Sequence, residues 1–128
     1  MNVRIYQPED YETVKGWWVA HGQHEDRVCP ANALPEDGFI IDDVCCAWVY
    51  LSANAPMCRL GWPVSNPGAK PKDVCNGLES VIISLHEFAR SCGCPLMEAT
   101  FSAPSLQRLM KKLGFQTGDT NLVGYLKG

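Results

Sequence analysis

The chain has 128 residues, of which 46% are hydrophobic and 20% are charged, and its formal net charge at pH 7 is -3. This length and composition suit one globular domain, residues 1–128, with a packed hydrophobic core. The weakly acidic balance argues against a broad basic face for nucleic acid. The longest apolar runs are far shorter than a membrane span, and no charged-then-apolar leader opens the chain. We therefore expect a cytoplasmic protein without membrane partners.

The seven cysteines are an odd number, and without a secretion signal we interpret them as reduced thiols. The nearest approach to a metal site is His21, His24 and Cys29, since a His-x-x-His spacing places two imidazoles on one helix face. Gly22 interrupts that helix, however, and no second cysteine pair lies at ligand spacing. We therefore predict no metal site.

The first half of the chain predicts a strand, a helix and three further strands. Alternation over residues 2–6 suits a strand, and Pro8-Glu-Asp10 then begins a helix whose apolar positions recur as far as His21. Later apolar runs bounded by turn residues predict strands over residues 39–41, 44–51 and 57–64. Gly61 and Pro63, inside the last of these strands, indicate a bulge or an edge.

The second half of the chain alternates helices with strands. Apolar residues at helical spacing from Val74 to Ala89 predict a long helix, with Asp73 as its N-cap and Gly93 as its C-cap. A strand over residues 96–101, a helix over 104–113 and a strand over 122–126 follow. This order predicts an α+β fold with a mixed, mostly antiparallel sheet, in which the strands before and after the long helix are parallel.

The helix that ends in Lys-Leu-Gly-Phe115 closes this element order, and both features resemble the GNAT family of acyl-CoA N-acyltransferases. The strings Trp17-Trp-x-x-His-Gly22, Leu34-Pro-x-x-Gly38 and Val64-Ser-Asn-Pro67 are also similar to small, divergent GNAT-like proteins of bacteriophages. The resemblance implies a three-layer fold whose fourth and fifth strands splay apart at a bulge. It also implies acetyl-CoA as the cofactor, with its pantetheine arm in the gap, pairing with exposed strand backbone.

The family's pyrophosphate loop, Arg/Gln-x-x-Gly-x-Gly/Ala, corresponds here to Lys70, Asp73 and Cys75. Lys70 keeps a positive charge, but Asp73 replaces a glycine where phosphate approaches backbone N–H groups at a helix N-terminus. The loop is therefore degenerate, and Pro71 removes one further donor. Together with the bulge Gly61-Trp-Pro-Val-Ser65, this loop supplies the cofactor-binding residues that the resemblance implies: Trp62, Val64, Ser65, Lys70, Lys72, Asp73, Val74 and Cys75.

The catalytic positions depart from the family pattern as well. Met110 stands where many members carry a tyrosine that protonates the leaving thiolate, and Ser102 and Ser105 are the nearest hydroxyls that could substitute. The reaction also needs a base near the splayed strands, for which Glu98 is the catalytic candidate. The strand pattern leaves open whether Glu98 faces the site or solvent.

The candidates for the acceptor site are Trp17, Trp18 and Asp42. Trp17 and Trp18 cannot both face inward from one helical stripe, so one of them is expected to be exposed or covered by residues 23–34. Asp42 lies in a tight turn between strands, which is also an ordinary place for an acidic residue. His86 falls off the apolar face of its helix and is expected to be solvated.

Two functions follow from these observations. In the first, the chain is an N-acyltransferase that moves an acetyl or other acyl group from acyl-CoA to the amine of a small molecule or a protein. In the second, it is a non-catalytic GNAT-fold binding protein or a virion-associated bacteriophage protein, as Asp73, Pro71 and Met110 indicate. Its partners would then be a second copy of the chain, in a homodimer, or virion proteins.

Overall fold

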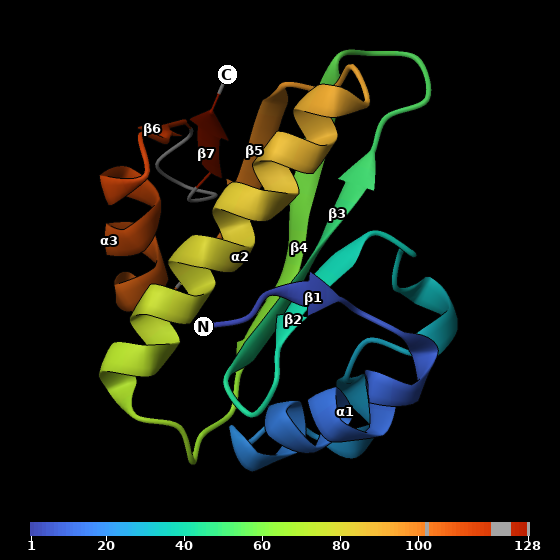
Figure 1. Cartoon of the computed structure of the whole chain (residues 1–128), viewed down its shortest axis with the longest axis vertical. Coiled ribbons are helices and arrows are strands. Elements are labelled where there is room, and N and C mark those ends of the chain that lie inside the picture. The colour runs from blue at the N-terminus through green and yellow to red at the C-terminus, as the bar shows by residue number, and fades with distance from the viewer. Residues whose placement is uncertain (102, 119–123, 128) are drawn as a thin grey trace.

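The computed structural model describes residues 1–101, 103–118 and 124–127 of the chain. Within these residues one sheet has the strand order β1-β2-β3-β4-β5-β7-β6, and α2 crosses in front of it (Figure 1). The strands are β1 (Arg4–Ile5), β2 (Gly38–Ile41), β3 (Cys45–Leu51), β4 (Met57–Ser65), β5 (Leu96–Thr100), β6 (Gln116–Thr117) and β7 (Gly124–Lys127). The helices are α1 (Tyr11–Ala20), α2 (Pro71–Ser91) and α3 (Pro104–Lys112), with short 3-10 turns η1 (Pro8–Asp10), η2 (Glu25–Arg27) and η3 (Ala31–Ala33).

The pairing of these strands confirms the predicted α+β architecture. Only β4 and β5, which precede and follow α2, pair in parallel, and the other pairs are antiparallel. The two-residue strand β6 was not predicted, because so short a segment carries no periodic signal. The predicted start of the last strand, Leu122, lies with Val123 outside the described residues.

Two predictions for α2 were wrong. The helix begins at Pro71 with Lys70 as its N-cap, so Asp73 lies inside the first turn instead of capping it. Proline is favoured there because the first helical N–H needs no intrahelical partner. His86 is buried, with 8% of its surface exposed, because its Nε2 hydrogen-bonds the carbonyl oxygen of Pro95 at 2.8 Å.

Side chains of the central strands alternate between two cores on opposite faces of the sheet. Leu60 and Met97 belong to the core that α2 and α3 cover. Trp48 and Val64 belong to the core that α1 covers, where the Trp48 ring stacks on Trp18 at a centroid distance of 5.8 Å. This alternation determines which strand side chains face each side of the functional region.

Strand β4 carries the predicted bulge. Trp62 and Pro63 together face the single residue Ala47 of β3, and Trp62 has a left-handed backbone with a φ of 57°. The pairing of β4 with β5 runs only from Met57 to Arg59. Beyond that point, no described residue of β5 pairs with β4, so the two strands splay apart as the family resemblance implied.

The Gly-Phe signature at the end of α3 is a helix-termination motif. The Gly114 N–H donates to the carbonyl of Lys111 at 3.1 Å, and the Phe115 N–H donates to the carbonyl of Met110 at 3.0 Å. This double closure needs a residue with positive φ, which is 93° at Gly114. It directs the buried Phe115 ring into the core under α2.

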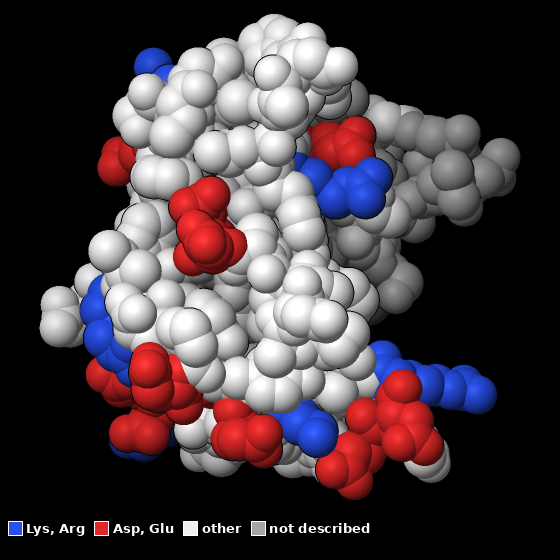
Figure 2. Space-filling model, turned by 90° about the vertical axis from the view of Figure 1, so that its right-hand side faces the viewer, with Lys and Arg blue, Asp and Glu red and all other residues white. Residues whose placement is uncertain are grey.

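Charged side chains are unevenly distributed on the surface. On the side shown in Figure 2, acidic and basic residues gather at the lower end, toward α1, and most of the remaining surface is uncharged. Among the described residues, no helix is long and apolar enough to span a membrane.

Arg4 joins three segments at the α1 end of the sheet. Its guanidinium donates to Asp10 at 2.7 Å and to Asp42 in the β2–β3 turn at 2.7 Å. These hydrogen bonds are the main reason why the pKa of each carboxyl lies below its ordinary value. Asp42 is thus held by Arg4 in a structural cluster.

We expect that replacing Arg4 with methionine moves acid unfolding to higher pH. A carboxyl with a lowered folded-state pKa adds stability above its ordinary pKa, which is about 3.9, and that stability disappears as the pH falls through the lowered value. Circular dichroism against pH measures the midpoint. The control is Arg90→Met, since Arg90 is exposed on α2 and forms no ion pair with a described residue. An unchanged midpoint in Arg4→Met would contradict the role of this cluster.

Candidate functional site

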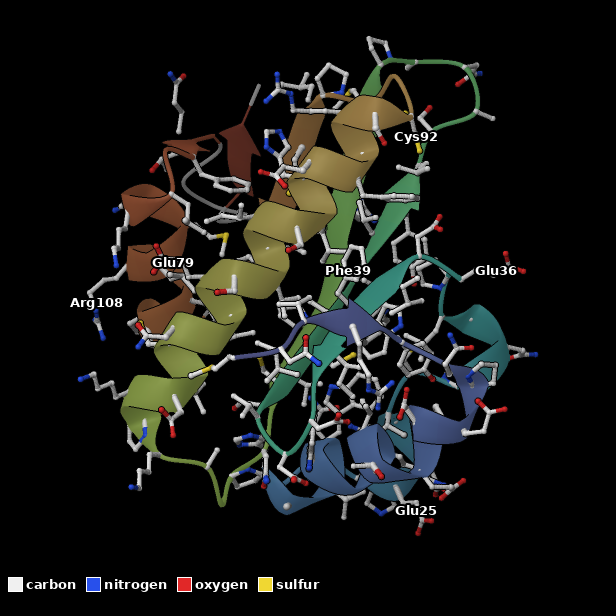
Figure 3. The ribbon with its side chains drawn as sticks, in the orientation of Figure 1. Glu25, Glu36, Phe39, Glu79, Cys92 and Arg108 are labelled. Carbon is white, nitrogen blue, oxygen red and sulfur yellow. The ribbon has the colours of Figure 1, made fainter. Side chains whose placement is uncertain are left out.

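A groove of about 330 Å³ lies where the first turns of α2, the β4–α2 loop and α3 meet. We call it the α2–α3 groove. Its lining includes three residues predicted to bind the cofactor, Ser65, Val74 and Cys75, and the predicted catalytic residue Ser105. Apolar side chains, among them Leu78 and Leu109, complete the lining. Glu79 faces the gap between α2 and α3 in Figure 3, and its Oε2 accepts an ion-pair hydrogen bond from Lys112 at 3.1 Å. The two helices are therefore held beside each other next to the groove.

The start of α2 offers a reduced set of anion-binding groups. The N–H groups of Lys72 and Asp73 are in the first turn, where the helix provides no acceptor, and Pro71 has no N–H. Exposed Lys70 and Lys72 add positive charge, while the half-buried Asp73 carboxylate adds negative charge. This end therefore retains donors for an anion but lacks the glycine-rich backbone that surrounds one closely.

A second cavity of about 330 Å³ opens where β4 and β5 separate. We call it the splay cavity. Its walls include Arg59, which is the last residue of β4 that pairs with β5, and Trp62 and Thr100, which lie beyond the last pair on β4 and β5. Since Arg59 and Thr100 alternate with residues of the α2-side core, the cavity lies on the face of the sheet opposite α2.

Tyr50 and Trp62 form a fixed wall of the splay cavity. The Trp62 Nε1–H donates to the Tyr50 hydroxyl at 2.8 Å, and that hydroxyl donates to the carbonyl oxygen of Ala33 at 3.0 Å. The Tyr50 ring lies over Gly61, where an added Cβ would stand 2.6 Å from the ring atom Cε2. Sequence reasoning missed Tyr50, although a glycine inside a strand signals a close approach of this kind.

Glu98 lies on the face of the sheet opposite α2. Its neighbours Met97 and Ala99 lie in the α2-side core, so the alternating Glu98 side chain points to the opposite face. The Nε and Nη2 atoms of Arg59 donate to its Oε1 at 3.1 and 2.9 Å. Glu98 thus points away from α2, pairs with Arg59 and keeps 38% of its side-chain surface exposed.

Other predicted site residues lie in different surroundings. Trp17 and Trp18 are both buried, with 7% and 3% of their surfaces exposed, so the alternative of an exposed tryptophan was wrong. They share a core with Val28 and Cys29, whose segment covers α1. Trp18 does not line the splay cavity, but its ring makes an edge-to-face contact with the cavity residue Trp62 at a centroid distance of 6.2 Å.

The remaining predictions concern the core and the groove. Val64 is buried in the α1-side core and can offer only its backbone to a ligand. Met110 is fully buried, so the side chain at this position is neither polar nor accessible. Ser102 lies outside the described residues. Sequence reasoning did not place His21 at the α2–α3 groove, where its Nε2 contacts the Ser65 carbonyl oxygen at 2.9 Å.

The cysteine thiols fall into two groups. All seven are free; Cys75 and Cys92 are exposed, and the other five are buried. Burial raises the pKa of the Cys45 thiol to about 12 and that of Cys58 to about 11. In the part of the chain that the structure describes, no cluster of three or more His, Cys, Asp or Glu residues could hold a metal ion.

No family model and no curated protein matches the chain. Several solved structures, however, are similar to the chain. The PaiA N-acetyltransferase of Thermoplasma acidophilum, in complex with coenzyme A, is 13% identical, with a TM-score of 0.71 over 98% of this chain and 95% of that one. A Desulfovibrio desulfuricans protein that carries the name of the GNAT family is 14% identical, with a TM-score of 0.68 over 98% of this chain and 96% of that one.

N-acetylglutamate synthase of Neisseria gonorrhoeae, complexed with coenzyme A and L-arginine, is 14% identical, with a TM-score of 0.71 over 98% of this chain. The match spans 32% of that enzyme, so this chain corresponds to about a third of its length. Each of these similarities extends over nearly the whole of this chain. The chain therefore has the fold of the GNAT N-acetyltransferases.

Proposed function

We propose that the chain is an acyl-CoA-dependent N-acyltransferase that acts on a primary amine. The observation that carries this proposal is the splay of β4 from β5, with the α2–α3 groove beginning at Ser65 and the splay cavity ending at Trp62. A thioester donor and an amine acceptor can approach the same stretch of β4 from these two cavities. Such positioning of two reactants is a large part of the catalysis of acyl transfer.

The residues of the groove fit the parts of coenzyme A. The β5-facing edge of β4 after Arg59 has no strand partner among the described residues, so its backbone groups are available to the amides of a pantetheine arm. The N–H groups of Lys72 and Asp73, together with the side chains of Lys70 and Lys72, would hold the pyrophosphate. Val74, Cys75 and Ser105 would line the path between these two regions.

The chain's own groups provide the remaining chemistry. Glu98, beside the splay cavity, would accept the proton of the attacking amine. The bulged backbone of residues 62–64 would stabilise the developing negative charge on the carbonyl oxygen, with the limit that Pro63 has no N–H. Bound acyl-CoA supplies an activated thioester.

The buried Met110 does not prevent this reaction. An alkyl thiol has a pKa near 8.5, so the thiolate is a good leaving group close to neutral pH and water can protonate it. Ser105, which is exposed in the groove, would provide a nearby hydroxyl. A proton donor on α3 is thus less important here than the base on β5.

A non-catalytic binding function is the second candidate. The Asp73 carboxylate in the first turn of α2 favours it, because a negative charge there repels a phosphate and competes for the same N–H groups. In this case the groove would hold no coenzyme. A direct measurement of coenzyme binding therefore distinguishes the two candidates.

Acetyl-CoA is expected to protect Cys75 from alkylation and to leave Cys92 unprotected. Cys75 lines the groove, whereas Figure 3 places Cys92 at the other end of α2. The reagent is N-ethylmaleimide, which acetyl-CoA does not consume because it has no free thiol. Peptide mass spectrometry measures the alkylation rates of Cys75 and Cys92 in the same sample. At about ten times its dissociation constant, a ligand that covers the thiol should slow its reaction about tenfold.

Equal slowing of Cys75 and Cys92 would indicate a general change in stability instead of occupation of the groove. An unchanged Cys75 rate at about 1 mM acetyl-CoA, a concentration that saturates sites with micromolar affinity, would contradict the proposed function. Free adenosine diphosphate serves as a second ligand, because it tests the pyrophosphate end without the pantetheine arm.

A further inference from the structure

The face of the sheet opposite α2 is only partly covered. The α1 core encloses Trp48 and Val64, but Tyr50 is only half-buried and Arg59 and Thr100 are exposed. Beside the splay cavity, this open region continues into a second depression of about 360 Å³, which we call the hairpin cavity. Tyr50 and Arg59 line both cavities, so the two cavities are adjacent.

Arg59 and Glu98 have unused hydrogen-bonding atoms at the junction of these cavities. Both hydrogen bonds of the pair end on Oε1 of Glu98. Neither Nη1 of Arg59 nor Oε2 of Glu98 has a partner among the described residues. The side chains keep 66% and 38% of their surfaces exposed, so a ligand can reach both free atoms.

The charges of the site are balanced. Among the described residues, Arg59 and Glu98 are the charged residues that line the two cavities. A ligand with only a positive charge would be attracted by Glu98 and repelled by Arg59 at similar distances. A ligand with one positive and one negative group can satisfy both, because a guanidinium edge suits a carboxylate and a carboxylate oxygen suits an ammonium group.

The hairpin cavity has an apolar lining next to this pair. Tyr50 and Met57 line it from this face of the sheet, while Leu51 and Cys58, which also border it, pack in or against the core that α2 covers. A side chain bound there would bury hydrophobic surface against Tyr50 and Met57, and the Tyr50 ring is fixed by its hydrogen bonds to Trp62 and Ala33. The depression is therefore suited to an apolar group attached near the two charged groups of the ligand.

We propose that the acceptor is a free amino acid with an apolar side chain, and this inference rests on the proposed function. Arg59 binds the α-carboxylate through Nη1, and Glu98 attracts the α-ammonium group through Oε2. The side chain occupies the hairpin cavity, and the amine points toward the splay between β4 and β5. A protein amine lacks the adjacent free carboxylate that this arrangement recognises.

The transfer is balanced in atoms and charge. The ammonium group loses a proton to Glu98, and the neutral amine attacks the carbonyl carbon of the acyl-CoA thioester. A C–N bond forms and the C–S bond breaks, so the products are an N-acyl amino acid and the coenzyme A thiolate. The amide nitrogen loses its second proton to water, and the thiolate is protonated by water.

The test compares each amino acid with the amine that lacks its carboxylate. Phenylalanine is paired with phenethylamine and leucine with isoamylamine, and mass spectrometry quantifies the acetylated products formed from acetyl-CoA. We expect kcat/KM to be about 10- to 100-fold higher for the amino acids than for the amines. Hydrogen bonds between Arg59 and the carboxylate of the amino acid should strengthen binding by about this factor. Arg59→Gln should raise KM for the amino acids about tenfold or more, so the ratio of kcat/KM between each amino acid and its amine should fall by about the same factor.

The matched control is Arg90→Gln, since Arg90 is exposed on α2, which covers the other face of the sheet. Equal kcat/KM for each amino acid and its amine would overturn the inference while leaving acyl transfer intact. So would an Arg59→Gln variant that affects both substrates equally, or faster transfer to the N-terminus of a peptide. If Cys75 is not protected and no amine is acetylated, the proposed function itself fails.

Binding without coenzyme gives an independent readout of the same inference. Phenylalanine and phenethylamine are titrated calorimetrically into the wild-type chain and into Arg59→Gln. Binding of phenylalanine that is lost in Arg59→Gln, with phenethylamine binding weakly to both, supports carboxylate recognition by Arg59. Absence of phenylalanine binding at millimolar concentration overturns it.

Discussion

Replacing Trp48 with alanine is expected to lower the free energy of unfolding by about 3–5 kcal/mol. The side chain has no exposed surface, stacks on Trp18 and contacts the edge of the Tyr6 ring at a centroid distance of 5.0 Å. A Cβ on Gly38 would overlap its ring, so the strand beside it is already built around the indole. Removal leaves a cavity that these rigid neighbours cannot fill.

The measurement is urea unfolding, with the slope of the transition checked for constancy between variants. Trp48→Phe is the matched variant and should cost clearly less, because it keeps an aromatic ring and has no N–H. The Trp48 Nε1 is buried and has no hydrogen-bond partner among the described residues, so its loss removes a polar group that none of them pairs. A loss below about 1 kcal/mol in Trp48→Ala would contradict the central position of this side chain in the α1 core.

Replacing Glu98 with glutamine is expected to reduce kcat for acyl transfer by about 10²- to 10⁴-fold, which is the usual contribution of a general base. The amide oxygen of glutamine can still accept the hydrogen bonds of Arg59, so the cross-strand contact survives. Stability should change by no more than about 1 kcal/mol, because the pair is exposed. Thermal unfolding of both proteins checks this point.

The control for Glu98→Gln is Glu87→Gln, since Glu87 is exposed on α2, on the opposite side of the sheet from the splay cavity. Protection of Cys75 by acetyl-CoA should be the same in wild type and Glu98→Gln, because the groove is unchanged. A full kcat in Glu98→Gln would mean that water, not Glu98, removes the proton from the amine.

Much of the fold could be predicted from local patterns. The helical spacing from Val74 to Ala89 predicted α2, and the order of helices and strands predicted a mixed, mostly antiparallel sheet. The Gly114-Phe115 ending predicted the close of α3, because few residues other than glycine adopt the positive φ of that turn. Gly61 and Pro63 predicted the bulge in β4, because glycine and proline inside a strand mark a bulge or an edge.

The site was less predictable because its contacts join distant parts of the chain. Arg59 and Glu98 are 39 positions apart, and they meet because β4 and β5 pair in one register and then separate. Tyr50 became part of the site through its hydrogen bonds to Trp62 and Ala33, which no local pattern signals. Ser105 and Cys75 share a groove because of how α3 packs beside α2.

The sequence by itself determined the order of the longer elements, most of their apolar positions and the close of α3, because these depend on interactions within a few residues. Only the tertiary structure decided that Glu98 pairs with Arg59 on the face of the sheet opposite α2, that His86 is buried against Pro95, and that both tryptophans of α1 are covered. Each of these outcomes depends on register and packing between elements. Those arise from the summed burial of many side chains and carry no signature in any short segment.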